Sequence, residues 1–204
     1  MIASVSDALG DGLAEIAALL QIPVLLGAIL ILAACALEVA RFALERWRRA
    51  SWQRGRKPVR ELAQLARARP EHRETLAAHA PDALAAQALR DIAQATANGR
   101  PDELEHALAD YELRVQRRLD RTRLLVRAGP AIGLMGTLIP LAPGLAALGE
   151  GEIGALAEDL RIAFAATVVG LLVGTTAFAL TLARTRMYSE DLAALERATG
   201  VKPT

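Results

Sequence analysis

The sequence predicts an all-α integral membrane protein with three transmembrane helices, its N-terminus outside and one large helical loop in the cytoplasm. Three runs of 22 residues each, 16–37, 128–149 and 162–183, contain no Asp, Glu, Lys or Arg. All 24 basic and 23 acidic residues lie in the other 138 positions, about a third of which are therefore charged. This division excludes an ordinary soluble globule and a disordered chain.

Each uncharged run is long enough to cross a membrane once. A helix of 22 residues covers roughly 33 Å, and the hydrocarbon core is about 30 Å thick. A buried soluble helix is the alternative, but such a helix usually keeps a polar face within that length. The first run is not a signal peptide, because the residues before it carry Asp7, Asp11 and Glu15 and no basic residue. We therefore expect it to be retained as a span.

Charge sets the predicted orientation. Residues 38–127 have 19 basic and 13 acidic side chains, and residues 184–204 have 4 and 3. Residues 1–15 and 150–161 are mainly acidic. The positive-inside rule then places 38–127 and the tail 184–204 in the cytoplasm, and 1–15 and the loop 150–161 outside. The side chains expected to anchor the inner ends of the spans are Arg46, Trp47, Arg48, Arg49, Trp52, Arg184, Arg186 and Tyr188.

The cytoplasmic segment 38–127 is predicted to be a set of short helices that ends in a long one. Prolines and the break at 98–101 divide it, and Pro81-Asp82 opens a helix that runs to about Thr96. From Asp102 to Arg127 apolar residues recur at helical spacing, and this helix is expected to continue into the second span. Its apolar stripe needs a partner, either the 82–96 helix or a neighbouring subunit.

The second and third spans each carry a face of small and hydroxyl-bearing residues. With 100° of rotation per residue, the members fall within an arc of about 100° in the second span and about 80° in the third. The second-span residues are Gly129, Gly133, Gly136, Thr137, Pro140 and Gly144, and the third-span residues are Thr167, Gly170, Gly174, Ala177 and Thr181. Tight helix packing is the simpler explanation, since small residues four apart let backbones approach closely. Pro140 and Pro143 add a distortion that a plain anchor does not require.

No span contains an acidic residue or a histidine, although proton-carrying transporters normally have one inside the membrane. The chain is therefore not a complete proton-driven machine by itself. Three scattered histidines, His72, His79 and His106, give no metal site, and no cofactor or nucleic-acid partner is expected. The chain has no enzyme motif and no inverted repeat of a transporter. A non-conducting oligomeric scaffold is the remaining alternative.

Two segments resemble the MotA/TolQ/ExbB family of ion-channel subunits. The segment GPAIGLMGTLIP, which begins at Gly129, is similar to the second-span helix of that family. The segment IAFAATVVGLLVG, which begins at Ile162, is similar to the family's third-span helix. The resemblance covers about residues 124–190, and the three-span order is that of the TolQ/ExbB branch. Ile162 stands where that branch often has a Glu, and Pro140 stands where the pattern usually has Gly.

The resemblance implies a homopentamer in a bacterial or archaeal cytoplasmic (inner) membrane that surrounds a single-span partner of the ExbD, TolR or MotB kind. The partner's membrane Asp would carry the ion, and Thr137 and Thr167 would face that Asp. Ion flow down the proton motive force would then drive mechanical work. Threonine oxygens can also help to hold Na⁺, so the choice between proton and sodium stays open.

Overall fold

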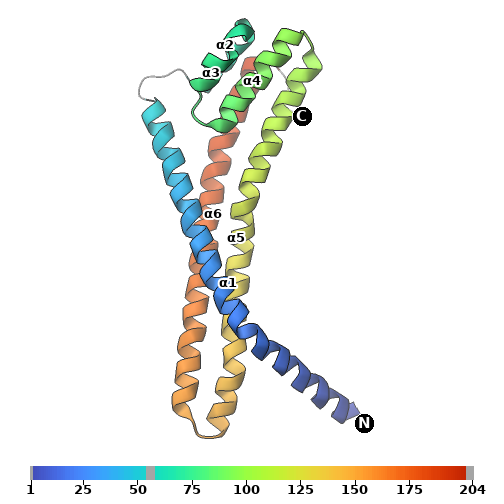
Figure 1. Ribbon diagram of the computed structural model, residues 1–204, viewed down its shortest axis with the longest axis vertical. Coiled ribbons are helices and arrows are strands. Elements are labelled where there is room, and N and C mark those ends of the chain that lie inside the picture. The colour runs from blue at the N-terminus through green and yellow to red at the C-terminus, as the bar shows by residue number, and fades with distance from the viewer. Residues whose placement is uncertain (1, 54–57, 201–204) are drawn as a thin grey trace. The chain divides into compact units, whose positions relative to one another are not determined.

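The computed structural model describes residues 2–53 and 58–200, and these fold almost entirely into helices (Figure 1). The elements are α1 (Ile2–Gln53), α2 (Val59–Ala68), the 3₁₀ turn η1 (Pro70–His72), α3 (Arg73–Ala78), α4 (Ala83–Asn98), α5 (Pro101–Gly149) and α6 (Ile153–Thr199). Three of them, α1, α5 and α6, are long and apolar enough to cross a membrane. The all-helical fold with three such helices agrees with the prediction.

The three uncharged runs lie inside helices that are much longer than the runs themselves. Only residues 150–152 of the predicted outer loop form a turn, and residues 153–161 already belong to α6. No glycine or proline occurs between Gly154 and Gly170 to end that helix. The segment 184–199, expected only as a tail, is helical as well.

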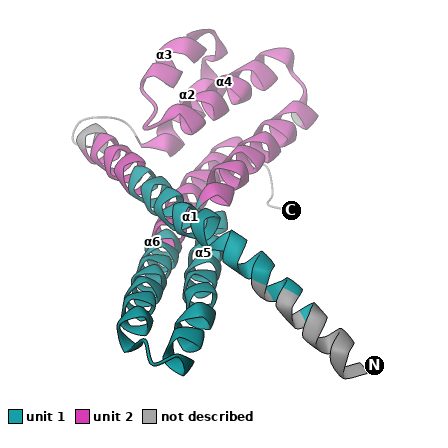
Figure 2. Cartoon of the chain, turned by 60° about the horizontal axis from the view of Figure 1, so that its bottom comes forward, with its two compact units in different colours: residues 1–38, 122–179 teal, residues 39–121, 180–204 magenta. Residues whose placement is uncertain are grey.

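The chain divides into two compact units, which Figure 2 shows in different colours. Unit 1 comprises residues 1–38 and 122–179, and unit 2 comprises residues 39–121 and 180–204. Unit 1 therefore holds nearly all of the uncharged runs, whereas unit 2 holds most of the charged residues. The division in space follows the division in charge that is visible in the sequence.

Unit 2 has a core made by four helices. The apolar stripe of α5, including Leu108 and Tyr111, packs with Leu89 and Ile92 of α4 and with Leu195 of α6. Four residues of α2 complete the cluster: Val59, Leu62, Ala63 and Ala66. The stripe thus packs against α4, one of its two expected partners, and also against α2 and the C-terminal part of α6.

Local sequence signals set the ends of α4. Asp82 is its N-cap, and its side chain accepts a hydrogen bond of 2.8 Å from the backbone N–H of Ala85. Gly99 follows the last residue with a φ of 67°, a left-handed conformation that glycine adopts without strain. The observed helix matches the predicted 82–96 segment to within two residues. The prediction that α5 runs without a break from the cytoplasmic segment into the second run is also confirmed.

Unit 1 has a small core and a large apolar surface. Cys35, Leu125, Val173 and Ala177 are buried together where α1, α5 and α6 meet. Large apolar side chains of all three runs remain exposed, among them Leu30, Leu138, Phe164 and Phe178. Exposed apolar surface on this scale is typical of helices that face lipid or other membrane helices.

Candidate functional site

The glycine faces predicted in the second and third runs pack against each other within one chain. A Cβ atom built on Gly129 would lie 2.7 Å from the carbonyl oxygen of Gly170 and 2.8 Å from the nitrogen of Gly174. A Cβ atom on Gly170 would lie 2.5 Å from the oxygen of Gly129 and 2.7 Å from Cα of Gly133. Only glycine permits backbones to approach this closely.

The other small residues of the two faces are buried in unit 1 as well. They are Gly133, Gly136, Pro140, Gly144, Gly174 and Ala177. A Cβ atom on Gly136 would meet Cβ of Ala166 at 2.5 Å, so the close contact continues past Gly133. Thr181 belongs to unit 2 and is half-buried there. The stripe of small residues therefore supports the contact between α5 and α6.

Helix α1 lies on one side of this helix pair. Cys35 Sγ is 3.9 Å from the backbone oxygen of Val173, and both residues share a cluster with Ala177 on α6. A Cβ atom built on Gly27 of α1 would lie 3.8 Å from Cδ1 of Ile132 on α5. A Cβ atom built on Gly136 of α5 would lie 3.9 Å from Cγ1 of Val24 on α1. At 100° of rotation per residue, Ile132 on α5 and Val173 on α6 lie on the same side of the glycine contact, which is the side that α1 covers.

Thr137 and Thr167 lie to the other side of the same contact. Thr137 is 100° beyond Gly136 on α5, and Thr167 is 60° beyond Gly170 on α6, in both cases away from the positions that contact α1. Since α5 and α6 run antiparallel and face each other, these two displacements point to the same side of the pair. Both threonines are half-buried. We call this side, which carries Thr137 and Thr167 and lies opposite α1, the threonine face.

The two threonines lie at similar heights along the helix pair. A Cβ atom on Gly133 would be 3.4 Å from Cα of Thr167, and Gly136 approaches Ala166. The position on α5 level with Thr167 is therefore close to residue 134, which is within about one helical turn of Thr137. The sequence-predicted pair is thus brought near each other by the glycine contact.

Both hydroxyl groups donate to their own helix. Thr137 Oγ1 donates to the Leu134 carbonyl at 2.7 Å, and Thr167 Oγ1 donates to the Ala163 carbonyl at 3.4 Å. Their oxygen lone pairs stay available, so each can accept a hydrogen bond from an incoming O–H group. The uncharged runs bring no acidic side chain and no histidine to this face. The threonine face therefore offers two hydroxyl oxygens as hydrogen-bond acceptors and no titratable side chain.

A buried carboxylate lies in unit 2, on α1. Glu45 Oε1 accepts a hydrogen bond of 2.7 Å from Tyr188, and Glu45 Oε2 lies 3.2 Å from Arg118 Nη2 and 4.0 Å from Arg184 Nε. Burial raises the pKa of Tyr188 above its usual value, and the negative charge of Glu45 adds to this rise. The Arg184 guanidinium also lies over the ring of Phe42. These contacts join α1, α5 and α6 inside unit 2.

This carboxylate cluster corrects one expectation. Arg184 and Tyr188 were expected as anchors at the membrane surface, but each has only 1% of its surface exposed. Their burial is favoured by Glu45 on a different helix, which lies 4.0 Å from Arg184 Nε and accepts a hydrogen bond from the Tyr188 hydroxyl. Trp47 is 70% exposed, as an anchor requires. The side chain of Trp52 lies outside the described residues.

Arg49 joins three helices of unit 2. Its Nη1 lies 2.8 Å from Asp191 on α6, and its Nη2 donates to Asp82, the N-cap of α4. Burial is the largest cause that raises the pKa of Asp191 to about 6, while Arg49 opposes this rise and Asp82 adds to it. One guanidinium is thus shared by two carboxylates. Among the described residues, no group of three His, Cys, Asp or Glu side chains is arranged to hold a metal ion.

Comparison with known protein families shows to which family the chain belongs. The profile of the MotA/TolQ/ExbB proton channel family matches residues 76–196, which extend from α3 to near the end of α6. The protein belongs to this family. The match covers more than half of the chain and includes both glycine faces and both threonines. No curated protein and no solved structure gives a significant match to the chain.

Family membership fixes the class of protein. Together with the three long apolar helices, it identifies a multi-pass membrane protein of the proton-channel type. The family is one of channels rather than of known enzymes. Its members work with single-span partners in membrane complexes. The helix α1 lies outside the matched residues, so the features that assign the family are those of α3 to α6.

Proposed function

We propose that this protein forms a pentameric ring around a single-span partner and converts proton motive force into mechanical work. In this arrangement the threonine face lines the inside of the ring, and α1 lies outside, toward lipid. The N-terminus lies outside the cytoplasmic membrane and unit 2 lies in the cytoplasm, as the charge distribution predicts. The partner is of the ExbD, TolR or MotB kind and supplies an Asp within the membrane.

The observation that carries this proposal is the position of the two threonines opposite α1. Cys35 and its neighbours cover one side of the α5–α6 pair, whereas Thr137 and Thr167 lie half-buried on the other. A second helix placed against the threonine face would meet two hydroxyl oxygens and no charge. A protonated Asp could donate to those oxygens, whereas an ionised Asp would be costly to bury there.

Protonation of the partner Asp would therefore change its preferred position in the ring. The membrane potential contributes about 2.3 kcal/mol for each charge moved across 100 mV. That energy is sufficient to bias a step of the partner relative to the ring. The description of the family favours the proton over Na⁺ as the coupling ion.

The alternative of a non-conducting scaffold rested on glycine faces that serve oligomerisation. In this structure the faces at Gly129 and Gly170 are occupied by each other within one chain. They are therefore not available as contacts between chains. The glycine faces, which suggested a scaffold, therefore no longer support it.

The test is proton flux through the ring reconstituted with its single-span partner. Thr137→Val and Thr167→Val keep the side-chain shape and remove the hydroxyl, so the double variant should assemble normally and lose proton flux. Thr176→Val is the matched control, because Thr176 is also half-buried on α6 but lies nine residues from Thr167, on the opposite face. Full flux in the double variant, or equal loss in the control, would refute the proposal.

A further inference from the structure

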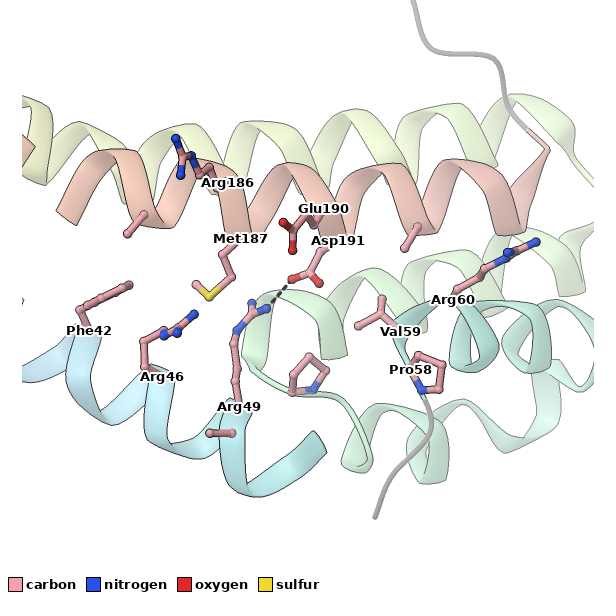
Figure 3. Close-up of a pocket in the computed structure, with 14 residues that line it drawn as sticks. Phe42, Arg46, Arg49, Pro58, Val59, Arg60, Arg186, Met187, Glu190 and Asp191 are labelled. Atoms are coloured by element: carbon pink, nitrogen blue, oxygen red, sulfur yellow. Dashed lines mark hydrogen bonds and ion pairs between the residues drawn. The ribbon is translucent and has the colours of Figure 1, made fainter. Parts of the chain in front are cut away.

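A groove of about 900 Å³ lies within unit 2, between α1, the start of α2 and α6 (Figure 3). Three exposed arginines line it, one from each of these helices: Arg46, Arg60 and Arg186. Within the described part of the chain, none of their side chains forms an ion pair. These three arginines lie at separate places along the groove, as Figure 3 shows, so each would meet a different part of a bound molecule.

The other charges in the lining leave the groove positive. Arg49 and Asp191 also line it but pair with each other at 2.8 Å, as the dashed line in Figure 3 shows. Glu190 is the one further acidic residue of the lining. Three arginines against a single carboxylate give a net charge of about +2, which favours an anion. Arg49 itself holds α1 and α6 together and thereby keeps the groove in shape.

The walls between the arginines are apolar and begin where two uncharged runs end. Phe42, Val59 and Met187 contribute side chains to the lining. Ala183, the last residue of the third run, is also a lining residue, and Phe42 follows the first run by five residues, or about 7.5 Å of helix. In a protein of this class, that depth is the level of lipid headgroups.

We propose that this groove binds the phosphate group of an anionic phospholipid, with the apolar part of the lipid against Phe42 and Met187. The shared chemistry is a phosphate anion, which guanidinium groups bind through paired, charge-assisted hydrogen bonds. Binding would neutralise like charges carried by three separate helices, so it would also stabilise unit 2. The site does not depend on the threonine face or on proton conduction.

The test uses the full chain in neutral detergent, with bound lipid counted by native mass spectrometry. Phosphatidylglycerol should bind at least tenfold more tightly than phosphatidylcholine. Each of Arg46→Gln, Arg60→Gln and Arg186→Gln should weaken phosphatidylglycerol binding about fivefold, and the triple variant roughly a hundredfold. Glu190→Gln removes the opposing carboxylate and should tighten binding severalfold, an outcome that a loss of structure cannot produce.

The matched control is the triple variant Arg69→Gln, Arg117→Gln and Arg121→Gln, which removes the same charge from exposed positions of unit 2 outside the groove. It should leave phosphatidylglycerol binding within about twofold. Equal loss in this control, or no preference for phosphatidylglycerol over phosphatidylcholine, would overturn the site. Glycerol phosphate serves as a soluble competitor without acyl chains. If it competes as strongly as phosphatidylglycerol does, the groove binds a phosphate group but the proposal that the ligand is a lipid is overturned.

Discussion

Replacing Gly170 with alanine tests the packing on which the threonine face depends. The new Cβ would lie 2.5 Å from the Gly129 oxygen and 2.7 Å from Cα of Gly133, whereas ordinary contacts begin at 3.4 Å. Both neighbours are backbone atoms, so no rotamer change relieves the overlap. The helices α5 and α6 must therefore separate by about 1 Å. Overpacking of this kind costs about 1–3 kcal/mol, partly offset by the roughly 0.5–1 kcal/mol that alanine contributes to a helix.

The chain carries its own reporter for this separation. Cys35 is its single cysteine, is 4% exposed, and packs against Leu125 of α5 and Val173 of α6. If the variant loses about 2 kcal/mol of packing, the open state should become about 30-fold more populated. The rate at which a maleimide modifies the Cys35 thiol in detergent should rise by a similar factor in Gly170→Ala.

Gly154→Ala is the matched control for helix propensity. Gly154 also lies in α6, and a Cβ atom there would meet nothing within 4 Å. Its modification rate at Cys35 should equal that of the unmodified sequence or fall below it. If Gly170→Ala leaves the rate unchanged, the close approach of the two helices is not what holds Cys35 buried, and the reasoning is refuted.

Two further predictions concern unit 2 and can be checked by thermal unfolding in detergent. Because the folded pKa of Asp191 is about 6, above its ordinary value of 3.8, this group stabilises the fold below about pH 4, and that contribution is lost as pH rises through 6. The unmodified protein should therefore lose stability between about pH 4 and 7 relative to Asp191→Asn, and parallel curves would contradict this. Glu45→Ala removes a buried carboxylate that pairs with Arg118 at 3.2 Å and accepts a hydrogen bond from Tyr188 at 2.7 Å, and it should cost about 3–5 kcal/mol. Tyr188→Phe removes one hydrogen bond to the same carboxylate and should cost only about 1 kcal/mol, so an equal loss in both would count against the cluster.

Much of the fold could be predicted because the signals are local. The absence of charge over 22 residues marks each run, and Asp82 and Gly99 mark the two ends of α4 by capping and by a left-handed φ. The helical arcs of small residues likewise placed Gly129 and Gly170 on packing faces. The role of Thr137 and Thr167 in ion passage stays a prediction, because it depends on a partner outside this chain.

Other features could not be read from local pattern. Arg184 and Tyr188 look like surface anchors in the sequence, since nothing near them indicates a buried partner. Glu45, which contacts both of them, lies about 140 residues away on α1. The groove lined by Arg46, Arg60 and Arg186 could not be predicted from the sequence either, because its three arginines come from three different helices.

By itself the sequence determined which segments are apolar, where α4 begins and ends, and which face of the second and third spans carries small residues, because composition and periodicity act over a few turns. Only the tertiary structure decided that the glycine faces close on each other and that α1 leaves the two threonines on the far side. The physical reason is that close packing and charge compensation depend on atoms brought together from distant parts of the chain, and no single stretch of residues contains both partners.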